Sequence, residues 1–493
     1  MSVNSAPVRP WAALWAMVIG FFMILVDTTI VSVANPSIMS GLGASLTATL
    51  WATSAYLLAY AVPLLITGRL GDRFGQRRVY LIGLTVFTLS SLACGLAGEI
   101  TTLIIARVFQ GLGAALMTPQ TMAVITRIFG PRERGSAMAV WGVTAGVATL
   151  VGPILGGFLL DGFGWEWIFF INVPVGVIAF ALALKYVPKL ETSAHRFDGL
   201  GVLLSAVGMF LVVFGIQEGE AFEWGRIWGP VTVWMLIAAG LVILALFVVW
   251  QRVQRGEPLM PLVLFRNRNF SVGSATIVTV GATITSLGLP IMFYFQLVEG
   301  LSPTRAALML VPTAVVSVLM ARPVGTYVDA HDSRRVSTIG LGLVALGLLG
   351  YAAMMWAQVP VLWMLVPSAV LGFGNSFMWG PLASITTFSL DRSLAGAGSG
   401  VYNTGRQVGA VLGAAAMAAL MQGRITAQLG AGAGGPGEAA GQLPEALREG
   451  FGIAMGQSLI LPVSVIIVGL LLTLCFAPRP TRTHTEAVAV AAK

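Results

Sequence analysis

Long apolar stretches separated by short polar segments run through almost the whole of this chain of 493 residues. A helix of about 20 apolar residues crosses a lipid bilayer, because its backbone polar groups bond within the helix. By this length criterion we count about fourteen such stretches. Hydrophobic residues make up 57% of the sequence and charged residues only 10%, a balance that excludes an ordinary soluble domain. The sequence therefore predicts an all-α membrane protein with about fourteen transmembrane helices.

The positive charges are distributed unevenly between the two sides of the predicted membrane. When the N-terminus is placed inside, most of the 28 Lys and Arg residues fall in inner loops and tails. Basic residues mark the cytoplasmic side of membrane proteins, so this distribution places both termini in the cytoplasm. The net charge of +8 thus reflects membrane topology, and no nucleic-acid partner is needed to explain it.

The predicted spans form two larger groups with a smaller pair between them. An N-terminal half covers residues 1–187, and a C-terminal half covers residues 269–477. Residues 188–268 link the halves and carry two additional spans that are poor in polar residues, so we expect them at the periphery, facing lipid. Residues 478–493 form a cytoplasmic tail, and the segment from Gln422 to Gly450, rich in Gly and Ala, is predicted to be a mobile outer loop.

A basic segment with the sequence GRLGDRFGQRR, from Gly68 to Arg78, follows the second predicted span. Its glycines favour a tight turn, and its arginines favour the cytoplasmic side. The same skeleton occurs at the inner end of an apolar segment in the second half of the chain. The matched positions are Gly68, Asp72, Arg77 and Arg78 in the first copy and Gly325, Asp329, Arg334 and Arg335 in the second. One loop repeated once per half indicates a duplicated membrane protein.

This repeated loop resembles the signature of the major facilitator superfamily, in which two six-helix halves rock around a central substrate site. Two extra central helices narrow the resemblance to the fourteen-helix drug:proton antiporter branch, often called EmrB/QacA-like. Further motifs that agree are LVDTTIVSVANP from Leu25 to Pro36, LIIARVFQGLGAA from Leu103 to Ala115, and WEWIFFINVP from Trp165 to Pro174. Ala148, Glu166 and Asn35 depart from the usual pattern, and we expect only the last two to affect what is transported.

A core of small residues, Gly152-Pro153-Ile154-Leu155-Gly156-Gly157, lies in the fifth predicted span. Small residues let two helices approach closely, and proline favours a kink. Ordinary close packing is one explanation of this sequence. The resemblance implies more, since a seam formed by Gly152, Pro153, Gly156 and Gly157 is thought to block leakage through antiporters. It is our main reason for expecting export rather than uptake.

Asp27 is the only acidic residue inside a predicted span. A carboxylate in hydrocarbon costs several kcal/mol, so an acid at this depth is expected to be functional. Burial disfavours its charged form and a nearby cation favours it, which suits a proton carrier that meets water on alternate sides. A permanent structural pair with a neighbour is the other explanation. The resemblance to antiporters supports the proton carrier.

Arg107 comes out at a similar depth to Asp27, in the same half, when each is measured along its span at about 1.5 Å per residue. We therefore expect Arg107 to set the protonation of Asp27. It would pair with the carboxylate and release it when a proton or a cationic substrate intervenes. Alternatively, Arg107 bonds backbone carbonyls and holds the fourth predicted span in place.

The repeated loop is expected to act as a gate. By the resemblance, Asp72 engages the positive end of the helix that begins near Ser393 when the inner side is closed, and Asp329 faces the helix start near Ser136. A solvated loop charge is the alternative for both acids. The gating residues predicted in this way are Gly68, Asp72, Arg73, Gly75, Arg77 and Asp329.

Arg406 lies near mid-depth of a span in the second half, whose predicted spans contain no acid to pair with it. It either bonds carbonyls of glycine-rich neighbours or meets an anionic or zwitterionic substrate. Other polar or aromatic residues predicted to line the substrate cavity are Tyr56, Tyr294, Gln296, Asn375, Phe377, Trp379, Tyr402 and Asn403. Each of them has packing or a place at the membrane interface as an alternative role.

The sequence contains no motif for catalysis or nucleotide binding. Cys94 and Cys475 lie far apart in apolar segments, where buried small side chains are expected, and the three histidines lie in polar segments. No metal site is therefore predicted, and the protein is not expected to be an enzyme. The pattern G-x-x-x-x-G-K-[ST] does not occur, so we expect the proton gradient, and no cofactor, to supply the energy.

The expected function is proton-coupled efflux of amphipathic drugs or other toxic small molecules across the bacterial cytoplasmic membrane. The expected partners are a small-molecule substrate, protons and the lipid bilayer, with no nucleic acid, and the sequence does not identify a protein partner. A dedicated exporter of one metabolite or antibiotic would carry the same motifs. A proton-coupled importer is the less favoured alternative, given Gly152 and Pro153.

Overall fold

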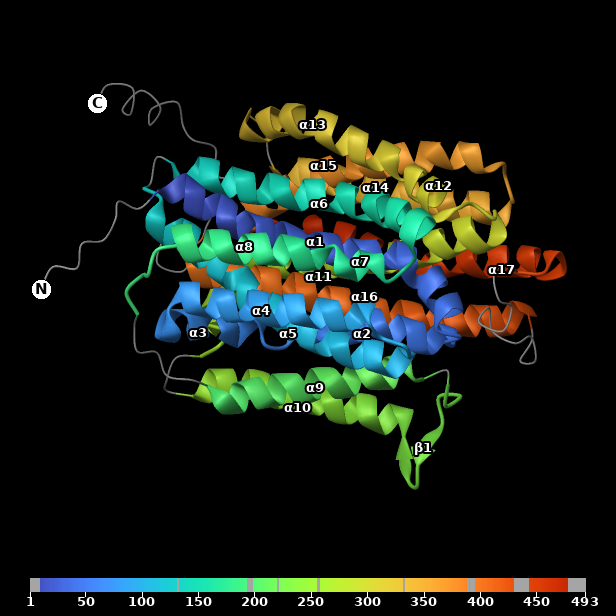
Figure 1. Cartoon of the computed structure of the whole chain (residues 1–493), viewed down its shortest axis with the longest axis horizontal. Helices are drawn as coiled ribbons and strands as arrows, with labels where there is room; N and C mark the ends of the chain where they lie inside the picture. The colour runs from blue at the N-terminus through green and yellow to red at the C-terminus, as the bar shows by residue number, and fades with distance from the viewer. Residues whose placement is uncertain are drawn as a thin grey trace, which may run out of the picture.

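The computed structural model describes most of the chain and shows one elongated bundle of helices (Figure 1). The described residues are 9–130, 133–192, 198–219, 221–254, 258–330, 333–387, 390, 395–429 and 443–477. Nearly all of them are helical, as the apolar stretches predict. The predicted tail, residues 478–493, lies outside the described residues.

The N-terminal half is built from long helices that run lengthwise through the bundle (Figure 1). They are α1 (Pro10–Gly41), α2 (Leu46–Ala61), α3 (Leu64–Phe74), α4 (Gln76–Gly95), α5 (Ile100–Ile128), α6 (Arg134–Phe163), α7 (Trp167–Phe170) and α8 (Asn172–Tyr186). Close pairs form where a glycine faces a neighbouring backbone. A Cβ atom on Gly113 of α5 would lie 2.6 Å from the backbone nitrogen of Phe87 on α4, so only glycine permits this approach.

The C-terminal half repeats this arrangement. Its elements are the 3-10 helix η1 (Leu262–Arg266), α11 (Arg268–Phe293), the π-helix η2 (Tyr294–Val298), α12 (Pro303–Leu308), α13 (Val311–Ala330), α14 (Ser333–Trp356), the 3-10 helix η3 (Val361–Met364), α15 (Leu365–Thr387), α16 (Ala395–Leu429), α17 (Glu445–Ser458) and α18 (Ile460–Thr473). The pairs α11–α16, α14–α15, α13–α15 and α11–α18 contact each other as α1–α6, α4–α5, α2–α5 and α1–α8 do. The shared packing pattern agrees with the duplication indicated by the repeated sequence.

The linker forms a helical pair, α9 (Gly199–Gln217) and α10 (Val233–Val253), joined by a small hairpin of β1 (Arg226–Trp228) and β2 (Val231–Thr232). The pair lies along one flank of the bundle, where α9 contacts α16 and α2 (Figure 1). Trp51 of α2 donates a hydrogen bond to Glu218 at one end of α9. Arg69 of α3 donates to the carbonyl oxygen of Pro258 beyond α10. The expected peripheral position is thus present, whereas the hairpin was not predicted.

The number of possible membrane spans is lower than the sequence predicts. Among the described residues, 12 helices are long and apolar enough to cross a membrane, or up to 13 if the bent pair α2–α3 forms one span. The bend between α2 and α3 is 52°. The 30-residue helix α6 is not in this count, because only its part Val151–Phe163 qualifies, as a shorter apolar helix.

Two predicted loops are largely helical. The segment Gly68 to Arg78 is not a tight loop, because α3 continues to Phe74 and α4 begins at Gln76. Only Gly75 breaks the helix, with φ of +93°, a value that favours glycine. The predicted outer loop is also helical at both of its ends, in α16 and α17, while residues 430–442 lie outside the described residues.

Candidate functional site

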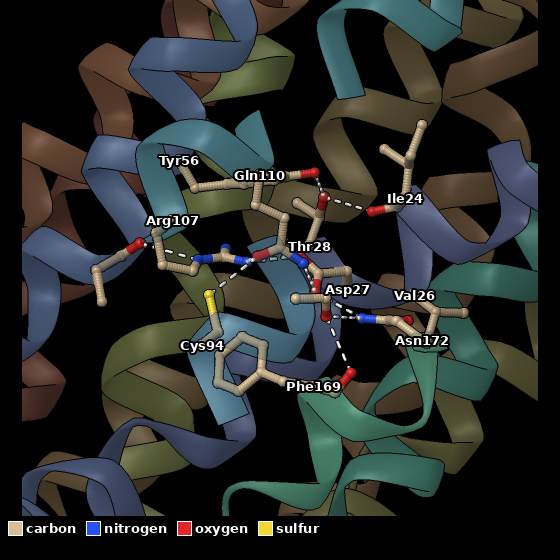
Figure 2. Close-up of polar contacts among 12 residues, drawn as sticks. Ile24, Val26, Asp27, Thr28, Tyr56, Cys94, Arg107, Gln110, Phe169 and Asn172 are labelled. Carbon is tan, nitrogen blue, oxygen red and sulfur yellow. Dashed lines mark hydrogen bonds and ion pairs between the residues drawn. The ribbon is translucent and has the colours of Figure 1, made fainter. Parts of the chain in front are cut away.

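Asp27 and Arg107 form an ion pair in the interior of the N-terminal half (Figure 2). The Arg107 Nη1 atom lies 2.6 Å from Asp27 Oδ2, and the two side chains are 1% and 0% exposed. Opposite charges taken out of water attract strongly, and removing one partner would leave the other uncompensated. The contact predicted from equal depth is therefore confirmed.

Two buried amides complete the hydrogen bonding of the Asp27 carboxylate (Figure 2). Gln110 Nε2 donates to Asp27 Oδ1 over 2.8 Å, and Asn172 Nδ2 donates to the same oxygen over 3.0 Å. Together with Arg107, three donors therefore hold this carboxylate, which is the environment a buried anion needs. We call Asp27, Arg107, Gln110 and Asn172 the carboxylate network.

A further layer of contacts positions the carboxylate network. Asn172 also donates to Ser91 Oγ over 3.0 Å, and Ser91 donates to the Phe169 carbonyl over 2.9 Å. Arg107 Nε donates over 3.1 Å to the carbonyl of Ala52 on α2, so Arg107 makes both of the contacts considered for it. The guanidinium carbon lies 4.0 Å from the centre of the Tyr56 ring, a cation–π distance. The pair is thus enclosed by α1, α2, α4, α5, α7 and α8.

Gln110 and Asn172 were not among the site residues predicted from the sequence. Both lie inside family-like motifs of the sequence, and Gln110 follows Arg107 by three residues, which places the two on one helix face. Cys94, which donates to Gln110 Oε1 over 3.5 Å, is buried as predicted. Cys475 is exposed, contrary to the prediction, because it lies beyond the end of α18.

The small residues of α6 form a tight seam with α1. A Cβ atom on Gly152 would lie 1.9 Å from Thr29 Oγ1, and one on Gly156 would lie 2.6 Å from Ile30 Cγ1. Pro153 is buried inside the helix. Gly157 instead meets the C-terminal half, where a Cβ would lie 2.6 Å from Thr304 Cα. Helix α6 therefore packs on its own half and also on the other one.

The predicted gating residues lie at one end of the bundle. Asp72 accepts hydrogen bonds from Arg127 over 2.7 Å and from Gln76 over 2.9 Å. All three residues belong to the N-terminal half, and the Asp72–Arg127 ion pair is partly exposed. The predicted contact of Asp72 with Ser393 falls outside the described residues and stays a prediction.

The other gating positions have structural neighbours of their own. Arg77 donates to the carbonyl oxygen of Leu184 on α8. The guanidinium of Arg73 lies 5.5 Å from the centre of the Phe74 ring. Gly68 faces Pro119 of α5. Asp329 belongs to the last turn of α13, but its side chain and that of Ser136 lie outside what the structure describes.

The predicted cavity residues do not share one environment. Tyr56 is buried against Arg107, and Tyr294 is buried in the core of the C-terminal half, where its hydroxyl donates to Glu299 over 2.9 Å. Phe377 packs with Val324 and Val336. Tyr294 and Phe377 are therefore core residues, because the helix face they occupy turns towards their own half.

The remaining candidates are Gln296, Asn375, Trp379, Tyr402, Asn403 and Arg406. Asn375 Oδ1 and the Tyr402 hydroxyl are buried without a hydrogen-bond partner in the part of the chain that the structure describes. Trp379 is exposed, whereas Asn403 and Arg406 are half-buried.

The two halves contact each other near the outer ends predicted for α1, α6 and α11. Gln296 Nε2 donates over 2.9 Å to the carbonyl of Val33 on α1. The Thr304 backbone N–H donates over 3.1 Å to Asp161 Oδ2 on α6. Gln296 therefore joins the halves, whereas the sequence predicted it to line the cavity.

Comparison with known proteins identifies the family. Residues 17–414 match the sequence profile described as Major Facilitator Superfamily. An uncharacterised MFS-type transporter of Mycobacterium tuberculosis is 47% identical over 472 residues, which cover 94% of this chain and 81% of that protein. The chain belongs to the Major Facilitator Superfamily. The family assignment agrees with the repeated loop and with the two halves of equal packing.

Two other similarities extend the family assignment. The tetracenomycin C resistance and export protein of Streptomyces glaucescens is 33% identical over 422 residues, covering 85% of this chain and 77% of that protein. The crystal structure of a D-xylose-proton symporter superposes with a TM-score of 0.64 at 14% identity, covering 95% of this chain and 98% of that one. The second similarity concerns the fold alone. This superfamily member is thus a multi-span membrane transporter of small molecules.

Proposed function

We propose that this protein exports amphipathic small molecules, antibiotics among them, from the bacterial cytoplasm in exchange for protons. The observation that carries the proposal is the fully buried carboxylate network around Asp27. A lone acid held by a cation and two amides gains or loses a proton only when its surroundings rearrange. Proton binding is thereby tied to a change of conformation, as exchange requires.

The direction of transport rests on the seam between α6 and α1. Gly152 and Gly156 leave no room for even one additional carbon atom between these helices. A seam this tight opposes leakage of protons or ions along α1, and leakage would dissipate the gradient that drives export. The name of the relative from Streptomyces glaucescens, a resistance and export protein, supports the same direction.

The membrane topology follows from the same proposal. We place both termini in the cytoplasm and count the bent pair α2–α3 and the 30-residue helix α6 as two further spans, which gives about fourteen. The halves then extend over residues 1–187 and 269–477, with α9 and α10 as the additional pair. The contacts through Gln296 and Thr304 would close the outer side, so this conformation faces the cytoplasm.

The test is proton release from energised everted vesicles on addition of fluorescent amphipathic compounds of either charge, the anion fluorescein and the cation ethidium among them. We expect release by at least one of these compounds with the wild type and by none with Asp27→Asn. Glu99→Gln serves as the matched control, because Glu99 is an exposed acid outside the carboxylate network. Full proton-driven transport by Asp27→Asn would contradict the proposal, as would vesicles of the wild type that respond to no compound.

A dedicated exporter of a single antibiotic is the second candidate. The observation that favours it is the 33% identity to a protein named for resistance to one compound, tetracenomycin C. A panel of chemically unrelated compounds separates the two candidates. Proton release by several of them supports broad export, and release by one of them supports the dedicated exporter.

A further inference from the structure

Arg406 is a charged side chain that the carboxylate network does not use. It is half-buried in α16, 11 residues after the helix begins at Ala395, or about 16 Å along the helix axis. Among the described residues it makes no ion pair and no hydrogen bond. Carbonyl bonding, the structural role considered for it, is therefore not seen in the described part of the chain.

The neighbours of α16 show which way Arg406 points. Gly409 and Gly413 lie against the backbone of α11, and a Cβ on Gly409 would be 2.0 Å from the Val278 oxygen. Val411 and Leu412 pack into a cluster of buried residues that also contains side chains of α2 and α9. The side of α16 that carries them therefore faces α2 and α9. At about 100° per residue, Arg406 leaves the helix on the side between α11 and α2. Helix α1 contacts both α2 and α11, so this side faces the interior between the halves.

Two tyrosines accompany Arg406 in this interior position. Tyr402 lies one turn before Arg406 on α16, and Tyr60 lies on α2, which packs on α16. The Tyr60 hydroxyl is bonded to Thr118 Oγ1 over 2.8 Å. The Tyr402 side chain is 8% exposed, and its hydroxyl has no partner in the described part of the chain. Arg406 therefore sits beside aromatic surface and one unused hydroxyl.

The charge beside Arg406 is positive in the part of the chain that the structure describes. Asp27 and Arg107 neutralise each other within hydrogen-bond distance, whereas Arg406 lies on a helix, α16, that contains no acid. A cation away from water is stabilised when an anion approaches it, and the attraction is stronger there than in bulk solvent. A cationic drug would meet repulsion at the same position.

We propose that the interior site of this transporter selects amphipathic aromatic anions, with Arg406 binding the carboxylate, sulfonate or ionised phenol of the substrate. The planar guanidinium matches a carboxylate with two parallel hydrogen bonds, a geometry that lysine does not reproduce. The rings of Tyr60 and Tyr402 make the surroundings of Arg406 aromatic, and the Tyr402 hydroxyl is available as a further donor. This inference rests on the proposed function, because it names the substrate class of the same transport site.

The experiment compares two probes that share a xanthene ring system and differ in charge, fluorescein and rhodamine 123. Binding to the purified full-length protein in lipid nanodiscs is followed by fluorescence polarisation, without a proton gradient. We expect the wild type to bind the anion about tenfold or more tighter than the cation, as one charged hydrogen-bond pair would produce. Arg406→Gln should remove that preference, and Arg406→Lys should restore part of it.

The matched control is Arg424→Gln, which removes an exposed arginine from the same helix and should leave both affinities unchanged. If Arg406→Gln does not fold, the wild type alone still decides, because rhodamine 123, which has the same ring system without an anionic group, should bind about tenfold more weakly than fluorescein. Fluorescein binding no tighter than rhodamine 123 would overturn the inference, as would an equal loss in Arg424→Gln. Charge-selective binding without proton-driven export would contradict only the proposed function.

Discussion

The two halves share one helix arrangement but differ in the polar groups they bury. Where α2 meets α5 in the N-terminal half, Arg107 donates to a backbone carbonyl and pairs with Asp27. Where α13 meets α15, the corresponding pair in the C-terminal half, neutral hydroxyls replace the charges. Thr313 Oγ1 donates to the Ser368 carbonyl over 2.7 Å, and Ser376 Oγ donates to the Ser317 carbonyl over 3.0 Å.

The two halves therefore share their helix packing but not their buried charges. The approach of paired helices depends on small residues, which both halves retain, as Gly113 and Gly409 illustrate. The buried charge depends on single side chains that one half carries and the other lacks. Under the proposals above, the N-terminal half handles the proton and the C-terminal half handles the charge of the substrate. Four substitutions test this division of labour.

The largest effect is expected when the ion pair is broken. Arg107→Leu leaves Asp27 buried without its cation, so we expect a loss of about 3–5 kcal/mol in the free energy of unfolding. The double variant Asp27→Asn and Arg107→Leu should recover part of that loss, because no charge is then left unpaired. Thermal unfolding in detergent measures both. Equal stability of the single and double variants would argue that the two charges do not depend on each other.

A smaller effect is expected from the amide beside the carboxylate. Asn172→Leu removes one donor to Asp27, for a loss of about 1.5–3 kcal/mol, the range for hydrogen bonds to charged groups. The carboxylate is then held by two donors instead of three, so the pH profile of proton release should change. Asn269→Leu is the control, since Asn269 bonds Ala477 at the other half and should leave the pH profile unchanged. An unchanged profile in Asn172→Leu would remove Asn172 from the coupling machinery.

The contact between the halves through α6 should respond to added volume. Gly157→Val forces atoms towards the Thr304 backbone, at a cost of about 1–3 kcal/mol that disfavours the closed contact. The Ser32 Cβ atom on α1 lies 3.6 Å from the position that a Cβ atom on Gly288 of α11 would take, so Ser32 is at the contact between the two halves. The rate at which the thiol of Ser32→Cys is alkylated therefore reports the opening of this contact. In a Cys475→Ser background, alkylation should accelerate about fivefold or more, the equilibrium factor for about 1 kcal/mol. Gly162→Val is the control because its Cβ would meet nothing within 4 Å, and equal rates in both variants would contradict the prediction.

The smallest effect is expected in the hydroxyl cluster of the C-terminal half. Thr313→Val removes the hydrogen bonds that the Thr313 hydroxyl makes with Ser368 and should lower stability by about 0.5–1.5 kcal/mol, as is typical of neutral pairs. Proton release and its pH profile should match those of the wild type. A shift of the profile as large as that of Asn172→Leu would mean that both halves take part in proton coupling.

The sequence identifies the charged part of the site because charges are rare in apolar spans. Asp27 and Arg107 stand out by residue type, and helix geometry alone places them at one depth. Gln110 and Asn172 do not stand out, since neutral amides are common and their role depends on which neighbour they meet. Both residues lie inside the quoted motifs. Their contacts with Asp27 depend on how the helices pack, which the order of residues in the chain does not give.

Packing also decides which predicted cavity residues face inwards. Tyr294 and Gln296 are two positions apart, yet one lies in the core of its half and the other joins the two halves. Apolar spans lack the polar outer face that would orient them, so the sequence does not specify their rotation. The prediction of a tight loop from Gly68 to Arg78 was wrong for another reason. Its glycines suggested a turn, but within this segment only Gly75 has a backbone conformation that excludes a helix.

The helical pair α9–α10 gives the two similar halves a covered side and an open side. Helix α9 packs on both α2 and α16 and so covers the seam between them. Hydrogen bonds from Trp51 and Arg69 hold the α9–α10 pair to the N-terminal half. The opposite seam, where α6 meets α12 and α13, has no such cover among the described residues. A compound dissolved in the lipid would therefore meet an uncovered seam between the halves on one flank only. The route by which a hydrophobic substrate enters is set by which seam carries the additional helices.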